Sequence, residues 1–382
     1  MPEEKKKLKI GILLRNRHDG PGGLEKVLEV LAKGIAKRDD AELFFYSLYP
    51  PRYTDFTKDF QNLEVLDPSK VIKRIASFLP AKLRRPLRKY YVKQHGYQLF
   101  DKMIADQIDV LITMDLSKQF LSNYPFLKRF KEKSGIPVLS WVHSSLSSSS
   151  DEVIKNVKDK VNLIDGHLCI SNGIAEEMKR YFDAENIKVI YNPVDDAPLI
   201  ARDKNRFLYI GRIDANKRVE SLLRNLQSLK GDWVLEIYGS TGNEKSDAVF
   251  QEVIQKLSLS EKVVFHDWKQ DAWAKVAQAG VLLLNSKKEG FGLVIVEAMQ
   301  RGIPVISSDC PVGPSELIQN DINGWLYDVN DEAKCRILLQ EILAGTRTLP
   351  EPVAVKQSVS KFETETYLDN FLQSIQSYLK HS

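Results

Sequence analysis

The sequence predicts an α/β protein made of two doubly wound domains, each with a parallel sheet covered by helices. Three observations support this class. Short apolar runs rich in β-branched residues alternate with longer segments of helical period along most of the chain, as in parallel sheets with covering helices. The length of 382 residues suits two domains of about 100–200 residues each. A proline-containing polar segment interrupts the alternating series once, over residues 192–198.

The first series of elements lies before this segment. We expect strands over residues 9–14, 42–48, 109–114, 137–142, 166–171 and 188–191. Helical stretches lie between them. Leu24, Val27, Leu28 and Leu31, for example, have the spacing of one buried helix face.

The second series follows the linker. Strands are expected over 206–210, 233–238, 263–266, 281–285 and 304–307, with helices that open near Lys217, Lys245, Asp271, Gly292 and Gly313. We therefore expect an N-terminal domain over 1–194, a C-terminal domain over 195–358, and a C-terminal helix over 359–382 that packs across them. Because doubly wound sheets bind ligands beyond the carboxyl ends of their strands, the strand-end loops hold the candidate site residues.

Composition narrows the class of protein further. Hydrophobic residues make up 43% and charged residues 28%, an ordinary globular mixture without an apolar run of the ~18 residues that a membrane span needs. The first residues lack the apolar stretch of a secretory signal, so we expect a cytoplasmic protein. Cys169, Cys310 and Cys335 have no C-x-x-C spacing, which predicts core thiols and neither a disulfide framework nor a zinc site.

Positive charge is concentrated in the basic segment, residues 69–93. This segment contains nine Lys and Arg residues and no Asp or Glu, although the net charge of the whole chain is only +4. Apolar residues alternate with the cations, and Pro80 and Pro86 predict short amphipathic pieces. Such pieces suit an anchor on an anionic membrane surface.

Two other interpretations of the basic segment stay open. One is a solvated helix face with its own core contacts. The other is a nucleic-acid-binding surface, but no groove-reading motif accompanies the cations, so we expect no nucleic-acid partner.

A glycine-rich turn follows the first strand. It contains Gly22 and Gly23 and opens a helix, so its backbone can approach an anion or a sugar oxygen. The turn lacks the G-x-G-x-x-G pattern of dinucleotide sites. A plain tight turn without a ligand is the alternative.

The first loop of the second half carries two cations. Arg212 follows a strand and Lys217 begins a helix, so the pair can bracket a diphosphate. Solvated surface cations are the alternative.

The stretch over residues 285–299 carries the richest pattern. A strand ends there, and a helix begins directly after Gly290-Phe291-Gly292-Leu293. The free N–H groups of the helix start can receive phosphate or hydroxyl oxygens, and the carboxylates of Glu289 and Glu297 can accept hydrogen bonds from sugar hydroxyls. Two glutamates at this spacing also fit a solvated helix face.

Together these residues resemble the retaining nucleotide-sugar glycosyltransferases of family four, which have the GT-B fold of two Rossmann-like domains facing across a cleft. The resemblance covers nearly the whole chain. It rests on Glu289 and Glu297 around Gly-Phe-Gly, on Arg212 with Lys217, and on Trp141-Val142-His143 at a strand end. Residues 307–314, followed by Asn-Gly at 323–324, are similar to bacterial enzymes that add galactose or N-acetylhexosamine to lipopolysaccharide cores and lipid-linked glycans.

The resemblance implies that residues 1–194 form the acceptor-side domain and residues 195–358 the nucleotide-sugar donor domain. It also implies a role for each candidate residue. Arg212 and Lys217 would bind the donor diphosphate, and Glu297 the ribose. The transferred hexose and the phosphate oxygens would contact Glu289 and the backbone of Gly290, Phe291, Gly292 and Leu293. His143 would lie near the reacting centre, Gly22 and Gly23 near the donor phosphates and the acceptor, and His266 and Trp268 near the base. The expected catalytic set is Glu289, His143, Arg212 and Lys217.

The implied activity is transfer of a hexose or N-acetylhexosamine, with retention, from a nucleotide sugar. A UDP-sugar is the expected donor, and a lipid-linked or lipopolysaccharide-type glycan is the expected acceptor, at the inner face of the membrane. Since the chain has no Asp-x-Asp motif, we expect no metal and no cofactor besides the donor. Two alternatives remain: a transferase of the same fold with a soluble acceptor, as in trehalose- or sucrose-type synthases, and a non-catalytic subunit that binds sugar nucleotides.

Overall fold

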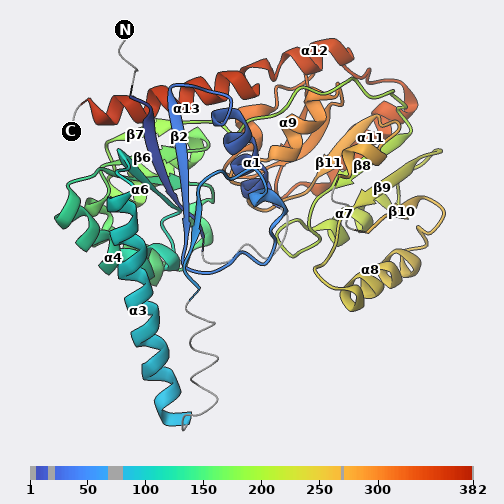
Figure 1. Cartoon of the computed structure of the whole chain (residues 1–382). Coiled ribbons are helices and arrows are strands. Elements are labelled where there is room, and N and C mark those ends of the chain that lie inside the picture. The colour runs from blue at the N-terminus through green and yellow to red at the C-terminus, as the bar shows by residue number, and fades with distance from the viewer. Residues whose placement is uncertain (1–5, 16–21, 68–80, 268–270, 381–382) are drawn as a thin grey trace. The chain divides into compact units, whose positions relative to one another are not determined.

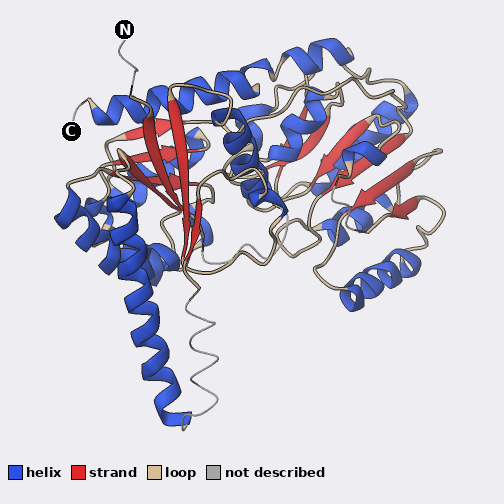
Figure 2. Ribbon diagram, viewed as in Figure 1, coloured by secondary structure: helices blue, strands red, loops and turns tan. Residues whose placement is uncertain are grey.

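The chain forms two compact units, each built around one parallel sheet (Figures 1 and 2). The structure is a computed structural model that describes all residues except 1–5, 16–21, 68–80, 268–270 and 381–382. The first unit comprises residues up to 191 together with 365–382, and the second comprises 192–364. The predicted α/β class with two doubly wound sheets is confirmed. The division expected from the sequence placed these boundaries after residues 194 and 358.

The sheet of the first unit has the strand order β3-β2-β1-β4-β5-β6-β7. Its strands are parallel: β1 (Leu8–Leu13), β2 (Ala41–Ser47), β3 (Leu63–Val65), β4 (Val110–Met114), β5 (Val138–Val142), β6 (Gly166–Cys169) and β7 (Ile187–Val189). The order runs outward in both directions from the adjacent strands β1 and β4, which pair Ile10 with Val110. The carboxyl ends of β1 and β4 therefore meet at the topological switch point, where such sheets bind ligands.

Helices cover this sheet. They are α1 (Gly23–Ile35), α3 (Ala81–Ala105), α4 (Lys118–Ser134), α5 (Asp151–Lys158), α6 (Asn172–Phe182) and α13 (Thr364–Leu379). The last helix packs against the first unit through Leu368, which lies over Gly34, and Tyr378, which lies over Gly166. A side chain at either glycine would collide with these residues, so both glycines permit the close approach.

The basic segment corrects one expectation. Helix α3 is continuous, with Pro86 inside it, so the predicted break at Pro86 is wrong; Pro80 lies outside the described residues. Proline has no N–H to donate to the carbonyl four residues earlier. Because Pro86 lies in the second turn of α3, the missing hydrogen bond affects only the start of the helix. The C-terminal half of α3 packs on α4, where Gly96 faces the ring of Phe126, whereas the N-terminal half projects away from the sheet (Figure 1).

The sheet of the second unit has the order β10-β9-β8-β11-β12-β13. Its strands are β8 (Arg206–Ile210), β9 (Val234–Tyr238), β10 (Val263–Phe265), β11 (Val281–Leu284), β12 (Val305–Asp309) and β13 (Gly324–Asp328). Strands β8 and β11 are neighbours at the switch point, where Phe207 pairs with Val281. The core of this unit is built around Trp233, Tyr209 and Phe207, all almost fully buried.

The helices of the second unit are α7 (Val219–Leu226), α8 (Glu244–Lys256), α9 (Leu293–Gln300), α10 (Pro314–Leu317), α11 (Glu332–Ala344) and α12 (Pro352–Gln357). Those expected near Lys217, Lys245, Gly292 and Gly313 are present. The helix expected near Asp271 is wrong, since the described residues that follow this position form a 3-10 turn, η4 (Trp273–Lys275), in its place.

The three cysteines are free and buried, and burial raises the pKa of each thiol to about 12. The expectation that they are core thiols is confirmed.

In the part of the chain that the structure describes, no helix combines the length and the apolar character that crossing a membrane requires.

Candidate functional site

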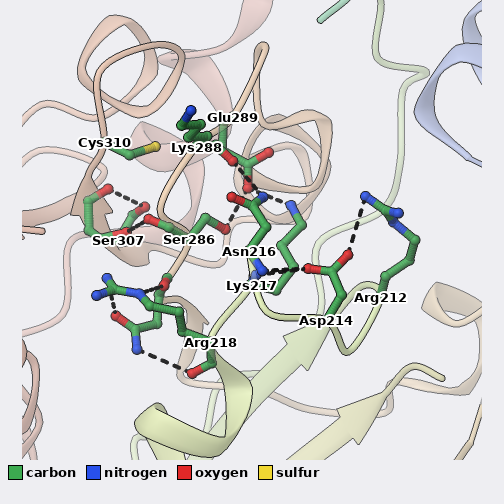
Figure 3. A network of polar contacts seen from close by, with 12 residues as sticks. Arg212, Asp214, Asn216, Lys217, Arg218, Ser286, Lys288, Glu289, Ser307 and Cys310 are labelled. Atoms are coloured by element: carbon green, nitrogen blue, oxygen red, sulfur yellow. Dashed lines mark hydrogen bonds and ion pairs between the residues drawn. The ribbon is translucent and has the colours of Figure 1, made fainter. Parts of the chain in front are cut away.

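Two strand-end loops of the second unit meet at an ion pair between Lys217 and Glu289. The first loop follows β8 and the second follows the neighbouring strand β11, so the parallel pairing brings the loops together. Lys217 Nζ lies 2.5 Å from Glu289 Oε1, which also accepts a hydrogen bond of 2.6 Å from Ser286 Oγ (Figure 3). The two side chains of the pair are only 17% and 10% exposed. Both residues were expected in the site from the sequence, and the structure brings them into contact.

The residues on either side of Lys217 fasten it to the second loop. Asn216 Nδ2 donates to the carbonyl of Lys288 over 2.8 Å, and the carbonyl of Asn216 accepts from the N–H of Lys287 over 2.8 Å. The guanidinium of Arg218 donates to the carbonyl and to the side-chain oxygen of Asn285 over 2.7 and 2.9 Å. The contacts of Asn216 and Arg218 therefore fix the position of Lys217 relative to Glu289.

Arg218 is a site residue that the sequence analysis missed. It has the left-handed backbone with φ +49°, a conformation that favours glycine. Its guanidinium also donates to the carbonyl of Val329 over 3.0 Å and pairs with Glu332 at 2.8 Å, so the side chain offsets the strain of its backbone. No pattern in the sequence signals this role, because the contacts depend on how β8 and β11 pair.

Arg212 lies on the same loop as Lys217 but in a different environment. Asp214 shapes the loop by accepting from the N–H groups of Asn216 and Lys217 over 2.9 and 3.0 Å. The guanidinium of Arg212 lies 3.4 Å from the other Asp214 oxygen and is 73% exposed, and it makes no contact with Glu289 (Figure 3). The loop thus offers one buried cation and one that faces solvent.

Helix α9 begins directly after the second loop. Gly292 precedes it with φ +91°, and an added Cβ there would lie 2.8 Å from Ile295 Cδ1. Gly313 packs behind this turn, where an added Cβ would lie 2.5 Å from the carbonyl oxygen of Phe291. Both glycines therefore suit the turn from which α9 begins, and the start of a helix offers free N–H groups to an anion.

The carboxylate of Glu297 on α9 is buried and hydrogen-bonded. It is 8% exposed and accepts a hydrogen bond of 2.8 Å from Trp273 Nε1. The guanidinium of Arg301 stacks on the same indole ring, 4.6 Å from the ring centre. Trp273 therefore fixes the orientation of this carboxylate.

His266, which was expected near the base, directly follows β10 at the edge of the sheet. His266 Nε2 lies 3.1 Å from Glu236 Oε2, and its ring stacks on Tyr238 with the ring centres 4.3 Å apart. Trp268 lies outside the described residues.

The remaining candidates lie in the first unit. Gly22 precedes α1 in extended conformation and Gly23 is the first residue of that helix. His143 directly follows β5, and its backbone N–H donates over 2.8 Å to Asp115, which also pairs with Arg15. The Nε2 atom of His143 is buried and has no partner among the described residues.

The electrostatics of this group keep the imidazole neutral. Burial, and secondarily the charge of Arg15, hold the pKa of His143 well below its ordinary value. Asp115 was not among the residues expected from the sequence, although an aspartate directly after a buried strand is a recognisable signal.

The described residues contain no cluster of three or more His, Cys, Asp or Glu side chains that could hold a metal ion. This holds for the surroundings of Lys217 and of His143 alike.

Comparison with known proteins gives a family for each half of the chain. Residues 21–197 match the model described as Glycosyltransferase Family 4, and residues 194–352 match Glycosyl transferases group 1. A lipopolysaccharide 1,6-galactosyltransferase of Escherichia coli (strain K12) is 35% identical over 72% of this chain and 77% of its own. A protein of the same description from Salmonella typhimurium is 31% identical over 75% and 80%.

Solved structures show the same architecture. The apo form of the lipopolysaccharide outer core galactosyltransferase WaaB superposes with a TM-score of 0.76 and 26% identity, covering 97% of this chain and 99% of that one. Anabaena HepE in complex with UDP and glucose is 17% identical and superposes with a TM-score of 0.73 over 97% of this chain and 100% of that one. At this identity the similarity supports only a shared fold. The expected GT-B fold is confirmed, and the chain belongs to the family of glycosyltransferases that combine a Family 4 domain with a group 1 domain.

Proposed function

We propose that this glycosyltransferase moves a hexose from a UDP-sugar to a lipopolysaccharide-type glycan, with retention and without a divalent cation. The observation that carries the proposal is the buried Lys217–Glu289 pair beside the start of α9. It joins a cation, a carboxylate and free helix N–H groups, which a leaving diphosphate and a sugar require. The similarity to two lipopolysaccharide 1,6-galactosyltransferases supports galactose as the first sugar to test.

The charges of the site suit the proposed reaction. When the sugar–phosphate bond breaks, negative charge grows on the diphosphate and positive charge on the anomeric carbon. Lys217, Arg212 and the N–H groups of α9 would stabilise the diphosphate, while Glu289 would accept hydrogen bonds from the hexose and orient it. Because the low pKa of His143 leaves its ring neutral near pH 7, this residue would act as a hydrogen-bonding group and not as the acid.

Fixed cations also support independence from metal ions. Arg212 and Lys217 carry the positive charge that Asp-x-Asp enzymes obtain from a bound cation, and Asp214 and Asn216 hold their loop in place. Transfer activity should therefore survive extensive treatment with a chelator. Activity that is lost in EDTA and restored by Mn²⁺ would overturn this part of the proposal.

The assay that tests the function pairs a panel of UDP-hexoses and UDP-N-acetylhexosamines with lipopolysaccharide truncated in its core. We expect one donor to add one sugar to the glycan, detected by mass spectrometry. Transfer only to free sugars or sugar phosphates would favour a soluble-acceptor enzyme. Binding of UDP-sugars without transfer or hydrolysis would favour a non-catalytic subunit.

A second proposal concerns the place of action, the inner surface of the membrane, and it rests on α3. The projecting part of this helix exposes Leu83 and Tyr90 beside the cations Arg84, Lys89 and Lys93, and residues 81–93 contain no acid. Basic and apolar side chains side by side favour an anionic lipid surface.

Co-sedimentation with phosphatidylglycerol vesicles tests this proposal against neutral phosphatidylcholine vesicles. Changing Arg84, Lys89 and Lys93 to Glu should abolish binding to anionic vesicles. The control changes three exposed lysines of the second unit, Lys230, Lys245 and Lys256, to Glu and should leave binding largely intact. Equal binding to both vesicle types, or equal effects of the two triple variants, would contradict the membrane proposal.

A further inference from the structure

The first unit contains a polar cavity that is separate from the Lys217 and Glu289 loops of the second unit. It has a volume of about 290 Å³ and opens at the carboxyl ends of β1, β4 and β5. We call it the serine cavity; its polar lining includes Arg15, Asp115, Ser117, Ser144, Ser145 and Ser149. Val142 and Ser144, the neighbours of His143 in the sequence, both line it, so the cavity adjoins that residue.

The charges in the serine cavity cancel. Arg15 and Asp115 form an ion pair with side chains 30% and 11% exposed, and Arg15 Nη2 also lies 3.5 Å from Ser144 Oγ. A phosphate or carboxylate would have to compete with Asp115 for the guanidinium. The remaining polar lining consists mainly of hydroxyl groups, which both donate and accept hydrogen bonds. This combination favours a neutral ligand that carries several hydroxyl groups.

The walls of the cavity are held in place from behind. The carboxylate of Glu177, 5% exposed on α6, accepts from Ser145 Oγ over 2.8 Å and from the N–H of Leu146 over 2.6 Å. Asp115 fixes the opposite wall through the N–H of His143. Ser117 caps α4 by accepting from the N–H of Gln119 over 3.2 Å. A ligand would therefore meet a preformed site and lose little free energy in ordering it.

We propose that the serine cavity binds a neutral sugar ring of the acceptor glycan, with Ser144 and Ser149 as hydrogen-bonding partners and the Arg15–Asp115 pair as its floor. This inference rests on the proposed function, since it names the part of the acceptor that the enzyme recognises. It commits to an uncharged ring: phosphorylated or carboxylated sugars of the acceptor are expected to lie elsewhere.

Steady-state kinetics on the full chain test this assignment. Ser149→Leu fills the cavity and should raise the KM for the glycan acceptor tenfold or more, while the KM for the donor and the rate of donor hydrolysis without acceptor change less than twofold. Ser149→Ala, which removes only the hydroxyl, should raise the acceptor KM about fivefold, as the loss of one hydrogen bond of about 1 kcal/mol implies. Ser148→Leu is the matched control, because Ser148 is exposed in the same loop and does not line the cavity.

The outcomes separate this inference from the proposed function. An unchanged acceptor KM in both Ser149 variants, with normal transfer by the unaltered enzyme, would overturn the serine cavity as an acceptor site and leave the function standing. No transfer by the unaltered enzyme would overturn the function itself.

Competition tests the charge of the ligand. Neutral methyl hexosides should compete with the acceptor, and Ser149→Leu should abolish that inhibition. Stronger competition by hexose 6-phosphates than by neutral methyl hexosides would contradict the uncharged ring.

Discussion

Lys217 and Glu289 are 72 residues apart in the sequence, yet they form a 2.5 Å ion pair with both side chains largely removed from solvent. Each belongs to a loop that leaves one of two adjacent parallel strands, and Asn216 and Arg218 tie the two loops together on either side of Lys217. The two loops therefore hold the pair in place. In the proposed reaction, a bound donor would offer its diphosphate to the lysine and its hydroxyl groups to the glutamate.

Glu289→Gln tests the carboxylate directly. The substitution keeps the shape of the side chain but removes the charge that pairs with Lys217 and accepts from the sugar. We expect turnover to fall about 100- to 1,000-fold, the usual cost of a lost transition-state contact. The exposed Glu261→Gln serves as the charge-matched control and should keep normal turnover. Near-normal turnover of Glu289→Gln would remove this carboxylate from the mechanism.

Arg218→Gly tests whether the arginine supports the site through its contacts. Glycine relieves the strain of φ +49° but loses the hydrogen bonds to Asn285 and Val329 and the pair with Glu332. Hydrogen bonds from charged donors contribute about 1.5–3 kcal/mol each, and the three that are lost together outweigh the roughly 1–2 kcal/mol of backbone strain. We expect the free energy of unfolding in urea to drop by at least about 2 kcal/mol and turnover to fall at least tenfold. Arg224→Ala on the exposed face of α7 is the control; a more stable Arg218→Gly variant would show that strain outweighs the contacts.

Gly292→Ala tests the turn before α9. An alanine at φ +91° is strained, and its Cβ would lie against Ile295, so the first N–H groups of the helix should turn away from the donor. The donor KM should rise at least tenfold. Gly345→Ala introduces a similar strain at φ +76° after α11, where only the Lys204 amine lies near the new Cβ, at 3.9 Å. Both variants should lose about 1 kcal/mol of stability, but an equal donor KM in both would contradict the role of α9.

A pH titration of stability tests the buried histidine of β6. Burial lowers the pKa of His167 to about 4, against an ordinary value of 6.5, and Ser140 Oγ lies 2.8 Å from its Nδ1. Between these values the unfolded chain binds a proton that the folded chain does not. The free energy of unfolding should therefore fall as the pH drops from 6.5 towards 4, by up to about 1.4 kcal/mol per pH unit from this residue, and His167 should add no slope above pH 7.

The comparison that isolates this residue is His167→Gln. The variant should be less stable than the unaltered protein near pH 7 but should lose stability less steeply between pH 6 and pH 4.5, as measured by urea unfolding at each pH. Parallel slopes in the two proteins would contradict the low pKa of His167.

The parts of the fold and site that the sequence predicted are those written in local patterns. The strand at 281–285, the Gly-Phe-Gly turn and the helix after it are recognisable because apolar runs, glycine positions and helix starts follow one another within a few residues. The same holds for Arg212 and Lys217 after the strand at 206–210. Parallel pairing of β8 with β11 then brings two such local patterns together.

The parts that the sequence did not predict depend on contacts between distant segments. Arg218 carries a positive φ that a non-glycine residue seldom adopts, and its partners lie 67 and 111 residues away. Asp115 has its role through Arg15 and the N–H of His143, again far along the chain. The continuity of α3 through Pro86 was missed for another reason. A proline near the start of a helix is tolerated where packing of the later turns, here on α4, stabilises the helix.

In the function that we propose, the loops around Lys217 and Glu289 carry out retaining hexosyl transfer without a metal ion. The decisive experiment is NMR of the glycan product formed in EDTA from an α-linked UDP-hexose and truncated lipopolysaccharide. We expect a new α-linked sugar from the unaltered enzyme and almost none from Glu289→Gln in the same time. A β-linked product, or equal product from both proteins, would refute this function.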